Sequence, residues 1–529
     1  MKTSTTEITK TQSLTEGVAK PSYRPWIPII LILILSLGLR LYQIGTESLW
    51  VDENFSIRDA EQLRLGTRPL YYLLLRFWMI FGTNDTWLRL LSVPFSLGCV
   101  FLTYLVGLKV ASRSVALIAA FMMAVSPLFV GYAQEIRMYS LSTFLTLWGT
   151  LALVNILEET TKYSFRPWIL ARGLALLTTP LNILILFVDL ILLGWKFREQ
   201  RHQFRRLGKG LILIGLFWLP FAYVLWKATP KFMSSWVANK PKPDILLIPS
   251  ILTVFTAFWP VSDLPKMGEL NFSLAAWGWN ETVMLFYMGY TLLTVFLFTI
   301  GLFQAKNQIQ KNVNPPKLVW VALWALLPSL VIIMISHLGS PIWRDRYLMF
   351  VAPYYLILLA VGFREVWHHY RVIALGIMAV YFVAVSGGLT HYYTTTYHDD
   401  WKGIAQLIEK NEKPGDVIGL YIVDWETHLT LPRYYKGSAP FHIMGREKLP
   451  RPPKETPVFV SKALDTLPPT DSRYWLVFYE PWGGGMEVVQ SLINKRFEVL
   501  DMQMFPNSVN DDEYVFLVKP RSTSKEAIN

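Results

Sequence analysis

Residues 26–43 read WIPIILILILSLGLRLYQ, an apolar run preceded by a polar segment that carries four basic residues. As a helix, this run has nearly the ~20 residues that a bilayer-spanning helix needs. No small-residue cleavage site follows it, so the pattern predicts a retained signal anchor and not a removed signal peptide. We therefore expect residues 1–25 to form a cytoplasmic N-terminal tail, with the first membrane span beginning at Trp26.

Similar apolar runs recur along the chain, which is 53% hydrophobic and only 17% charged over 529 residues. Such a composition favours a bilayer as the solvent. Ten more runs of spanning or slightly shorter length follow the first, at 90–108, 114–132, 138–157, 168–179, 180–195, 210–226, 284–303, 317–337, 347–363 and 372–388. They predict a mainly α-helical, polytopic membrane bundle of about 11 spans. The two runs that meet at Thr178-Thr179-Pro180 are short, so a single broken, re-entrant element remains an alternative there.

The loops between these runs carry clusters of Lys and Arg. The strongest cluster lies in residues 196–209, and four weaker ones fall on the same side of the predicted threading, near 109–113, 162–166, 306–317 and 364–371. Cytoplasmic loops are enriched in basic residues, so we assign this side to the cytoplasmic face of a bacterial plasma (inner) membrane. The net charge of +12 is dispersed among these loops, which argues against a nucleic-acid partner.

The extracytoplasmic side then receives residues 44–89, the Gln134-Glu135 connection, the loop around 343–346 and everything after about 389. Residues 227–283, rich in proline and tryptophan, are expected on the same side as an interfacial segment. From residue 391 to 529 the composition is that of a soluble domain, separate from the membrane domain at 26–390. Strand patterns alternate with helical ones there and predict a small extracytoplasmic α/β domain, with strands at 416–423, 474–479, 497–504 and 514–519 and helices at 401–412 and 486–496.

The first candidate site is an acidic cluster beside aromatics, Glu47-Ser48-Leu49-Trp50-Val51-Asp52-Glu53, just beyond the first span. Carboxylates near apolar surface tend to have raised proton affinity, which suits a general base. The alternative is a solvated loop in which Asp52 or Glu53 caps a helix over residues 54–63.

Two further polar clusters are expected on the same face. Gln134, Glu135, Arg137 and Tyr139 lie between two apolar runs, where ionisable groups are costly and often line a cavity. A simple Glu135–Arg137 pair in a short turn is the alternative. Arg344, Arg346 and Tyr347 precede another span, and the arginines can either hold a phosphate or anchor the helix at the interface. Arg40, near the end of the first span, is expected to be such a snorkelling anchor.

Taken in order, these segments resemble the GT-C membrane glycosyltransferases, and within them the branch of protein mannosyltransferases and aminoarabinose transferases. The matching motifs span roughly residues 26–390 and are Glu47 to Glu53, Pro69-Leu70-Tyr71-Tyr72-Leu73-Leu74-Leu75, Leu88-Arg89-Leu90-Leu91-Ser92, Ala133-Gln134-Glu135-Ile136-Arg137-Met138-Tyr139 and Arg346-Tyr347-Leu348. Several motifs in a fixed order are more specific than any one of them alone.

The resemblance implies transfer of a sugar from a polyprenyl-phosphate donor to an acceptor hydroxyl on the extracytoplasmic face, with inversion at the anomeric carbon. In this reading Asp52 is the general base, while Glu53 and Glu135 shape the pocket. Arg346, with Arg344, lies near the lipid phosphate. The residues implied in substrate binding are Glu47, Trp50, Gln134, Arg137, Tyr139, Arg344, Arg346 and Tyr347. The acceptor is left open among a glycan of the cell envelope, a lipid and a protein.

Two histidines common among relatives are missing, because this chain has Thr67-Arg68-Pro69 and Thr178-Thr179-Pro180 where they are found. No other histidine lies in the three clusters, so we expect neither a metal nor a cofactor. Three alternatives stay open: a ligase or polymerase that uses a pyrophosphate-linked donor, a transporter or flippase for lipid-linked sugars, and a catalytically inactive membrane scaffold.

Overall fold

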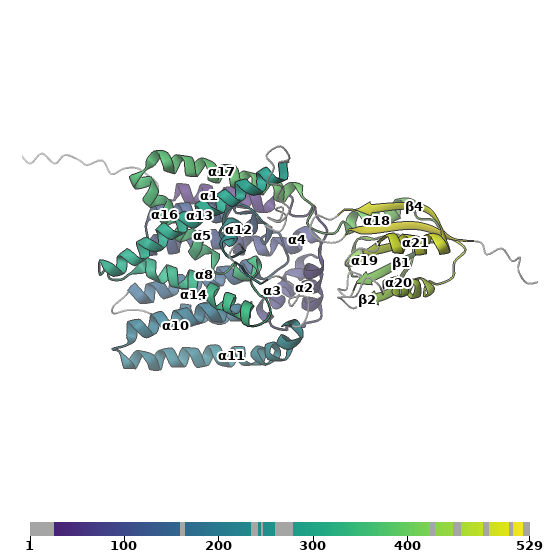
Figure 1. Cartoon of the computed structure of the whole chain (residues 1–529). Helices are drawn as coiled ribbons and strands as arrows, with labels where there is room; N and C mark the ends of the chain where they lie inside the picture. The colour runs from purple at the N-terminus through teal and green to yellow at the C-terminus, as the bar shows by residue number, and fades with distance from the viewer. Residues whose placement is uncertain are drawn as a thin grey trace, which may run out of the picture.

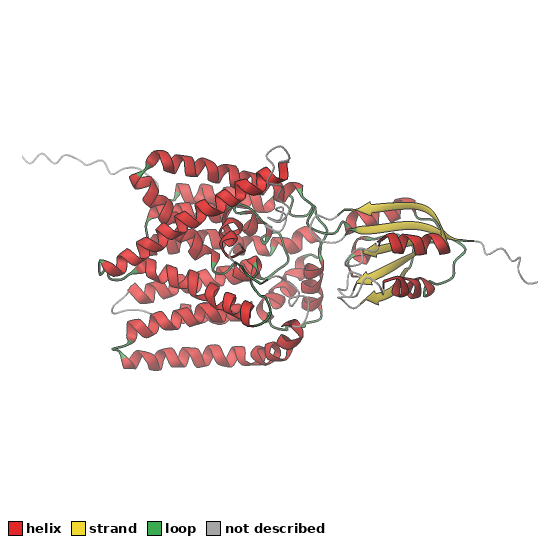
Figure 2. Cartoon of the chain, in the orientation of Figure 1, coloured by secondary structure: helices red, strands yellow, loops and turns green. Residues whose placement is uncertain are grey.

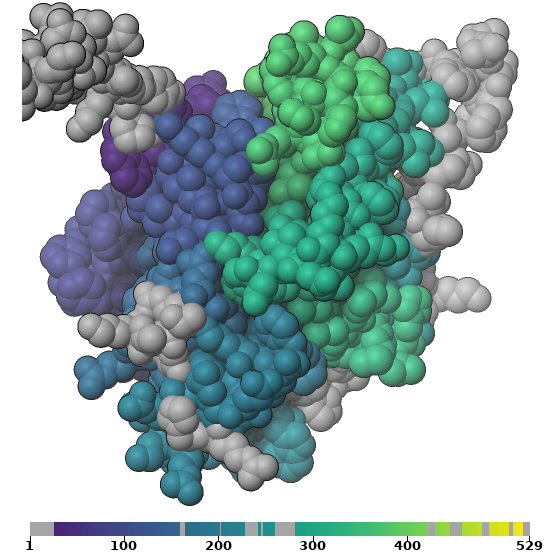
Figure 3. Space-filling model, turned by 90° about the vertical axis from the view of Figure 1, so that its left-hand side faces the viewer, coloured from purple at the N-terminus to yellow at the C-terminus, as the bar shows by residue number. Residues whose placement is uncertain are grey.

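The computed structural model describes residues 26–158, 164–233, 242–244, 247–259, 279–423, 429–447, 456–479, 486–506 and 512–521. A bundle of helices makes up the larger part, and a five-stranded sheet with its helices lies at one end of that bundle (Figures 1 and 2). From the opposite end (Figure 3), the green α17 lies against the teal helices, in agreement with its contacts with α13 and α16.

The helical part contains seventeen of the described α-helices, which are α1 (Ile27–Leu41), α2 (Val51–Glu61), α3 (Pro69–Trp78), α4 (Asp85–Leu90), α5 (Ser92–Val110), α6 (Arg113–Val125), α7 (Pro127–Gly131), α8 (Tyr139–Glu158), α9 (Arg166–Leu176), α10 (Ile183–Phe197), α11 (Arg201–Met233), α12 (Leu247–Thr256), α13 (Trp279–Gln310), α14 (Lys317–Leu338), α15 (Asp345–Leu348), α16 (Ala352–His369) and α17 (Arg371–Thr394). Within the described residues, seven helical stretches are long and apolar enough to cross a membrane, namely Asp85–Val110, Tyr139–Glu158, Pro180–Phe197, Gln203–Lys227, Glu281–Gln310, Lys317–Leu338 and Arg371–Thr394. The mainly helical architecture is confirmed, while the count of about 11 spans stays a prediction.

At Thr178-Thr179-Pro180 the chain forms two helices, α9 and α10, joined by the short 3-10 turn Pro180–Asn182. The Asn182 amide donates to the Ala175 carbonyl at 2.9 Å and to Ser142 Oγ at 2.9 Å, so it satisfies the polar groups that the break exposes.

One expectation about the membrane interface is wrong. Arg40 does not snorkel: its side chain is 0% exposed and donates to Ser96 Oγ at 2.7 Å and to the Ala124 carbonyl at 2.8 Å. The interfacial position expected for 227–283 stays a prediction; within its described part, residues 251–256 of α12 are buried and α12 packs on α7, α13 and α16. Residues 260–278 lie outside the described part of the chain.

An ion pair between Arg172 and Asp189 joins α9 to α10 inside the bundle, with side chains 1% and 0% exposed. Trp168 and Trp324 also donate their indole N–H groups to Asp189, at 2.6 and 2.9 Å. A charge buried at membrane depth normally marks function unless it is fully paired. Here the hydrogen bonds pair both charges, and the network ties α9, α10 and α14 together.

The C-terminal unit consists of α18 (Trp401–Asn411), β1 (Val417–Val423), α19 (Leu431–Tyr434), β2 (Phe441–Glu447), α20 (Thr456–Asp465), β3 (Tyr474–Tyr479), α21 (Met486–Arg496), β4 (Phe497–Phe505) and β5 (Glu513–Pro520). The sheet order is β2-β1-β3-β5-β4, with β1 parallel to β2 and β3, and β5 antiparallel to β3 and β4. One face packs on α18 and α19 and the other on α20 and α21. All four predicted strands are confirmed; β2 and α20 were not predicted.

Glu513, the first residue of β5, is 0% exposed. Burial, and then the neighbouring Asp399 carboxylate, raise the pKa of Glu513 to about 11. A carboxyl whose pKa is raised on folding supports stability at acid pH, and that support is lost as the pH rises from about 4.5 toward 11. Glu513→Gln removes the titrating proton, so we expect it to stabilise the protein by about 1–3 kcal/mol at pH 8 and little at pH 5. Thermal unfolding at the two pH values measures this, and equal effects at both would contradict it.

Candidate active site

The segment from Ile44 to Trp50, which carries the first residues of the acidic cluster and is called the acidic loop below, leads directly into α2. Trp50 is its N-cap, and the Glu53 carboxylate accepts the Trp50 backbone N–H at 3.3 Å. Neither Asp52 nor Glu53 is therefore the N-cap of a helix over 54–63; both lie in its first turn, where the helix dipole favours negative charge.

Asp52 lies between two arginines from distant parts of the chain. Its Oδ2 atom is 3.1 Å from Arg137 Nη2 and 3.5 Å from Arg346 Nη1. The Asp52 side chain is 25% exposed, against 6% for Arg137 and 16% for Arg346. Burial raises the pKa of Asp52, but the two guanidiniums outweigh it and hold that pKa below its usual range. Asp52 is therefore ionised at neutral pH.

Glu53 faces the opposite way and is completely buried. It forms a two-point ion pair with Arg89, at 3.0 Å and 2.8 Å, and accepts the backbone N–H of Ile136 at 2.9 Å. The three remaining Arg89 N–H groups go to the carbonyls of Ile44, Glu47 and Ser48. With these contacts, Glu53 joins the acidic loop to the turn that carries Glu135 and Arg137.

Gln134 and Glu135 lie in that turn, between α7 and α8, and have different surroundings. The Gln134 amide donates to the carbonyls of Arg40 and Tyr42 and accepts from the Tyr392 hydroxyl, so it closes the end of α1. Glu135 is 6% exposed and its Oε2 atom has no hydrogen-bond partner within the described residues. Burial first, and then the Glu53 carboxylate, raise the pKa of Glu135 well above its usual range, which keeps it neutral.

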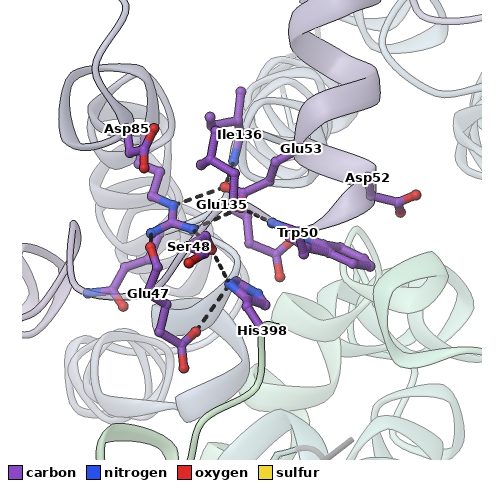
Figure 4. Close-up of polar contacts among 12 residues, drawn as sticks. Glu47, Ser48, Trp50, Asp52, Glu53, Asp85, Glu135, Ile136 and His398 are labelled. Carbon is purple, nitrogen blue, oxygen red and sulfur yellow. Dashed lines mark hydrogen bonds and ion pairs between the residues drawn. The ribbon is translucent and has the colours of Figure 1, made fainter. Parts of the chain in front are cut away.

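Glu47 and Trp50 both contact His398, which follows them in the sequence by 351 and 348 residues, respectively. His398 Nδ1 lies 3.1 Å from Glu47 Oε2, and its ring stacks on Trp50 at a centroid distance of 5.9 Å. Figure 4 shows Asp52 pointing away from this Glu47–His398 pair, with Glu135 and Trp50 between them.

In the third cluster, Arg346 contacts Asp52 from α15. Arg346 lies 5.4 Å from the ring of Tyr347, and Arg137 lies 5.8 Å from the ring of Tyr139. Arg344 has a buried Nη2 atom without a hydrogen-bond partner among the described residues. Tyr139, Arg346 and Tyr347 line a narrow hollow together with Thr179, so the Thr178-Thr179-Pro180 turn also reaches this side.

A larger cavity of about 340 Å³ lies on the other side. Its walls include Glu47, Gln134, Glu135 and His398, together with the aromatic rings of Trp259, Tyr392 and Tyr397. Asp52 is not part of its lining. The structure thus forms two groups among the predicted residues. One group contains Asp52, Arg137, Tyr139, Arg346 and Tyr347, and the other, at the cavity, contains Glu47, Gln134 and Glu135.

Three residues that hold the acidic loop were missed in the sequence: Arg89, Lys402 and His398. Arg89 stands in the motif Leu88-Arg89-Leu90-Leu91-Ser92, where a charge within an apolar run was the available signal. Lys402 and His398 carried no local signal. Lys402 Nζ donates to the carbonyls of Gly45 and Glu47, each at 2.9 Å, and so holds the acidic loop from the C-terminal unit.

No family model matches this sequence, and no curated protein matches it. Among solved structures, ArnT from Cupriavidus metallidurans in the apo state superposes with a TM-score of 0.54 at 12% identity, covering 92% of this chain and 97% of ArnT. The same protein bound to undecaprenyl phosphate gives a TM-score of 0.54 at 11% identity, covering 93% and 98%. The oligosaccharyltransferase AglB from Archaeoglobus fulgidus gives 0.45 at 12% identity, covering 77% and 64%. ArnT is a membrane glycosyltransferase, and the resemblance drawn from the ordered motifs is confirmed in the fold: this chain has the GT-C fold.

Proposed function

We propose that this protein transfers a sugar from a polyprenyl-phosphate donor to an acceptor hydroxyl, with inversion at the anomeric carbon. The observation that carries the proposal is the contact of the Asp52 carboxylate with Arg137 and Arg346, within the fold of a membrane glycosyltransferase. Three segments that are far apart in the sequence supply one base and two cations at a single point.

This arrangement suits displacement of a phosphate by a hydroxyl. The acceptor needs a carboxylate that removes its proton, and the leaving phosphate needs cations more than it needs an acid. Arg346 and Arg344 are the cations for that phosphate, because guanidinium groups bind phosphate oxygens with two parallel hydrogen bonds. A phosphate that binds Arg346 competes with Asp52 for it. Asp52 then loses part of its charge partner, its pKa rises, and it becomes a stronger base once the donor is bound.

The lipid carrier is supported by a structural neighbour. ArnT, which shares the fold, has been solved with undecaprenyl phosphate. We extend this class of carrier to the present chain, in which Arg137 lies just before α8, a helix long and apolar enough to cross a membrane, and Arg346 lies in α15 just before α16.

We place the reaction at the extracytoplasmic face of the plasma membrane. The C-terminal unit holds the acidic loop through Lys402 of α18, and His398, just before α18, contacts Ser48 of that loop, so the unit and Asp52 share one end of the bundle (Figure 1). Five clusters of basic residues in the sequence support a cytoplasmic position for the opposite end and for the tail 1–25.

The test is a transfer assay with the full-length protein in liposomes, a panel of polyprenyl-phosphate sugars and a membrane extract as the source of acceptor. We expect release of polyprenyl phosphate together with a labelled acceptor from at least one donor. Movement of lipid-linked sugar across the bilayer without transfer would favour a flippase. Transfer from pyrophosphate-linked donors alone would favour a ligase or polymerase. If no donor supports transfer or movement of sugar, the result would favour a catalytically inactive membrane scaffold.

A further inference from the structure

Asp52, Arg137 and Arg346 do not line the cavity of about 340 Å³ beside Glu135, and its volume is within the ~300–1,000 Å³ that is usual for ligand pockets. It is formed jointly by the acidic loop, by the turn after α7 and by residues 392–398 and Asp400. A ligand in it would touch both the bundle and the segment that leads into the C-terminal unit.

The charged groups around this cavity argue against an anion. Arg89, the arginine of its lining, uses all five N–H groups on Glu53 and on backbone carbonyls. Glu47 is paired with His398, and Asp400 accepts the Gly403 N–H at 2.9 Å as the cap of α18. A phosphate would therefore meet carboxylates and no available guanidinium, whereas the arginines beside Asp52 offer the opposite environment.

The same walls suit an uncharged, hydroxyl-bearing ligand. Glu135 is more than nine-tenths buried, and its Oε2 atom lacks a hydrogen-bond partner within the described chain. Such an atom costs free energy unless a ligand satisfies it. Trp259, Tyr392 and Tyr397 line the cavity, and Tyr397 stacks on the other two, at centroid distances of 6.2 Å from Trp259 and 5.7 Å from Tyr392. Aromatic side chains beside carboxyl groups match the apolar faces and the hydroxyls of a sugar ring.

We propose that this cavity binds an uncharged sugar ring of the acceptor, one that does not itself react. The inference rests on the proposed function. A donor sugar is bonded directly to its phosphate and must lie beside Arg346, so a sugar in the cavity belongs to the acceptor. Because Asp52 does not line the cavity, the hydroxyl that reacts lies on a neighbouring ring or group. The acceptor is therefore a glycan or a glycolipid and not an unmodified protein side chain.

The experiment measures binding without transfer. The full-length protein in nanodiscs is titrated with neutral methyl glycosides of mannose, glucose and galactose, and binding is followed by saturation-transfer NMR. Thr396→Trp fills the cavity, and Glu135→Ala removes the unpartnered carboxyl. Each should weaken binding at least about ten-fold. Glu135→Gln, which keeps a hydrogen-bonding group, should stay close to the unchanged protein. Thr390→Trp, at an exposed position of α17, is the matched control for an added indole.

Thermal unfolding of each variant verifies that it is folded. The proposal is overturned by absence of saturable glycoside binding, by unchanged binding in both Thr396→Trp and Glu135→Ala, or by binding that Arg346→Ala abolishes. Preference for a phosphate-bearing sugar would also overturn it. These outcomes are independent of catalysis: glycoside binding without transfer from any donor contradicts only the proposed function, and transfer without glycoside binding contradicts only the cavity.

Discussion

Changing Asp52 to asparagine is expected to lower sugar transfer by about 10²–10⁴-fold, the usual contribution of a general base. Asparagine keeps the size of the side chain and its place beside Arg137 and Arg346, but it cannot take a proton. Initial rates in the liposome assay measure the effect. Asp59→Asn is a matched control, because Asp59 lies on the same helix with a similar exposure, 21% against 25%, and pairs with the neighbouring Arg58.

The pH profile gives a second check on the same residue. The pKa of Asp52 is held below its ordinary value of 3.8, so the base form persists through neutral pH and is lost only as the pH falls below about 4. We expect kcat/KM, which reports the free enzyme, to stay level from pH 7 down to about 5. If Glu135 were the base, its raised pKa would make the rate fall at a higher pH than expected for Asp52. Such an early fall, or full activity of Asp52→Asn, would exclude Asp52 as the base.

Replacing Arg89 by methionine should destabilise the protein by about 3–5 kcal/mol, because one partner of a buried ion pair is removed and the other remains charged. The side chains of Arg89 and Glu53 are 3% and 0% exposed, so water cannot solvate the carboxylate that is left. Glu47 and Ser48 keep other partners for their carbonyls, in Lys402 and His398. Most of the cost therefore comes from the unpaired charge of Glu53. Unfolding in mixed micelles measures the loss.

A double variant separates the charge from the packing. Arg89→Met combined with Glu53→Gln removes both charges and should recover about 1–3 kcal/mol of the loss. Arg58→Met is the control for a surface pair, and we expect it to cost less than about 1 kcal/mol. If the double variant is as unstable as Arg89→Met alone, the charge of Glu53 is not the cause.

Local patterns in the sequence carry most of the fold. Apolar runs mark the long helices because a bilayer demands a fixed length of apolar side chains. Runs of apolar and aromatic residues mark β1, β3 and β5 because both sides of these strands are buried. The strand β2 was not predicted because FHIMGRE mixes a glycine with charged residues. It lies at the edge of the sheet, where burial produces a weaker hydrophobic pattern.

Contacts between residues that are far apart in the sequence could not be predicted. The clusters at Asp52, Arg137 and Arg346 were found separately, and only their order suggested a common site. That His398 would lie on Trp50, or that Arg40 would be buried against Ser96, depends on packing across 348 and 56 residues, respectively, and no local pattern encodes it. No local pattern shows either that Glu135 lines the cavity while Asp52 does not.

The loop before α2 illustrates how a backbone can be recognised independently of its side chains. Five successive carbonyls, from Ile44 to Ser48, accept hydrogen bonds from Arg89 or Lys402. Every amino acid has a carbonyl, so a residue such as Thr46 can be exchanged while the path of the loop is kept, whereas a side chain at Gly45 would collide with Thr86. Arg89 and Lys402 have no such freedom. In related chains we expect these two cations to be constant where the loop they hold is variable, and a change at one of them to be accompanied by a change at the other.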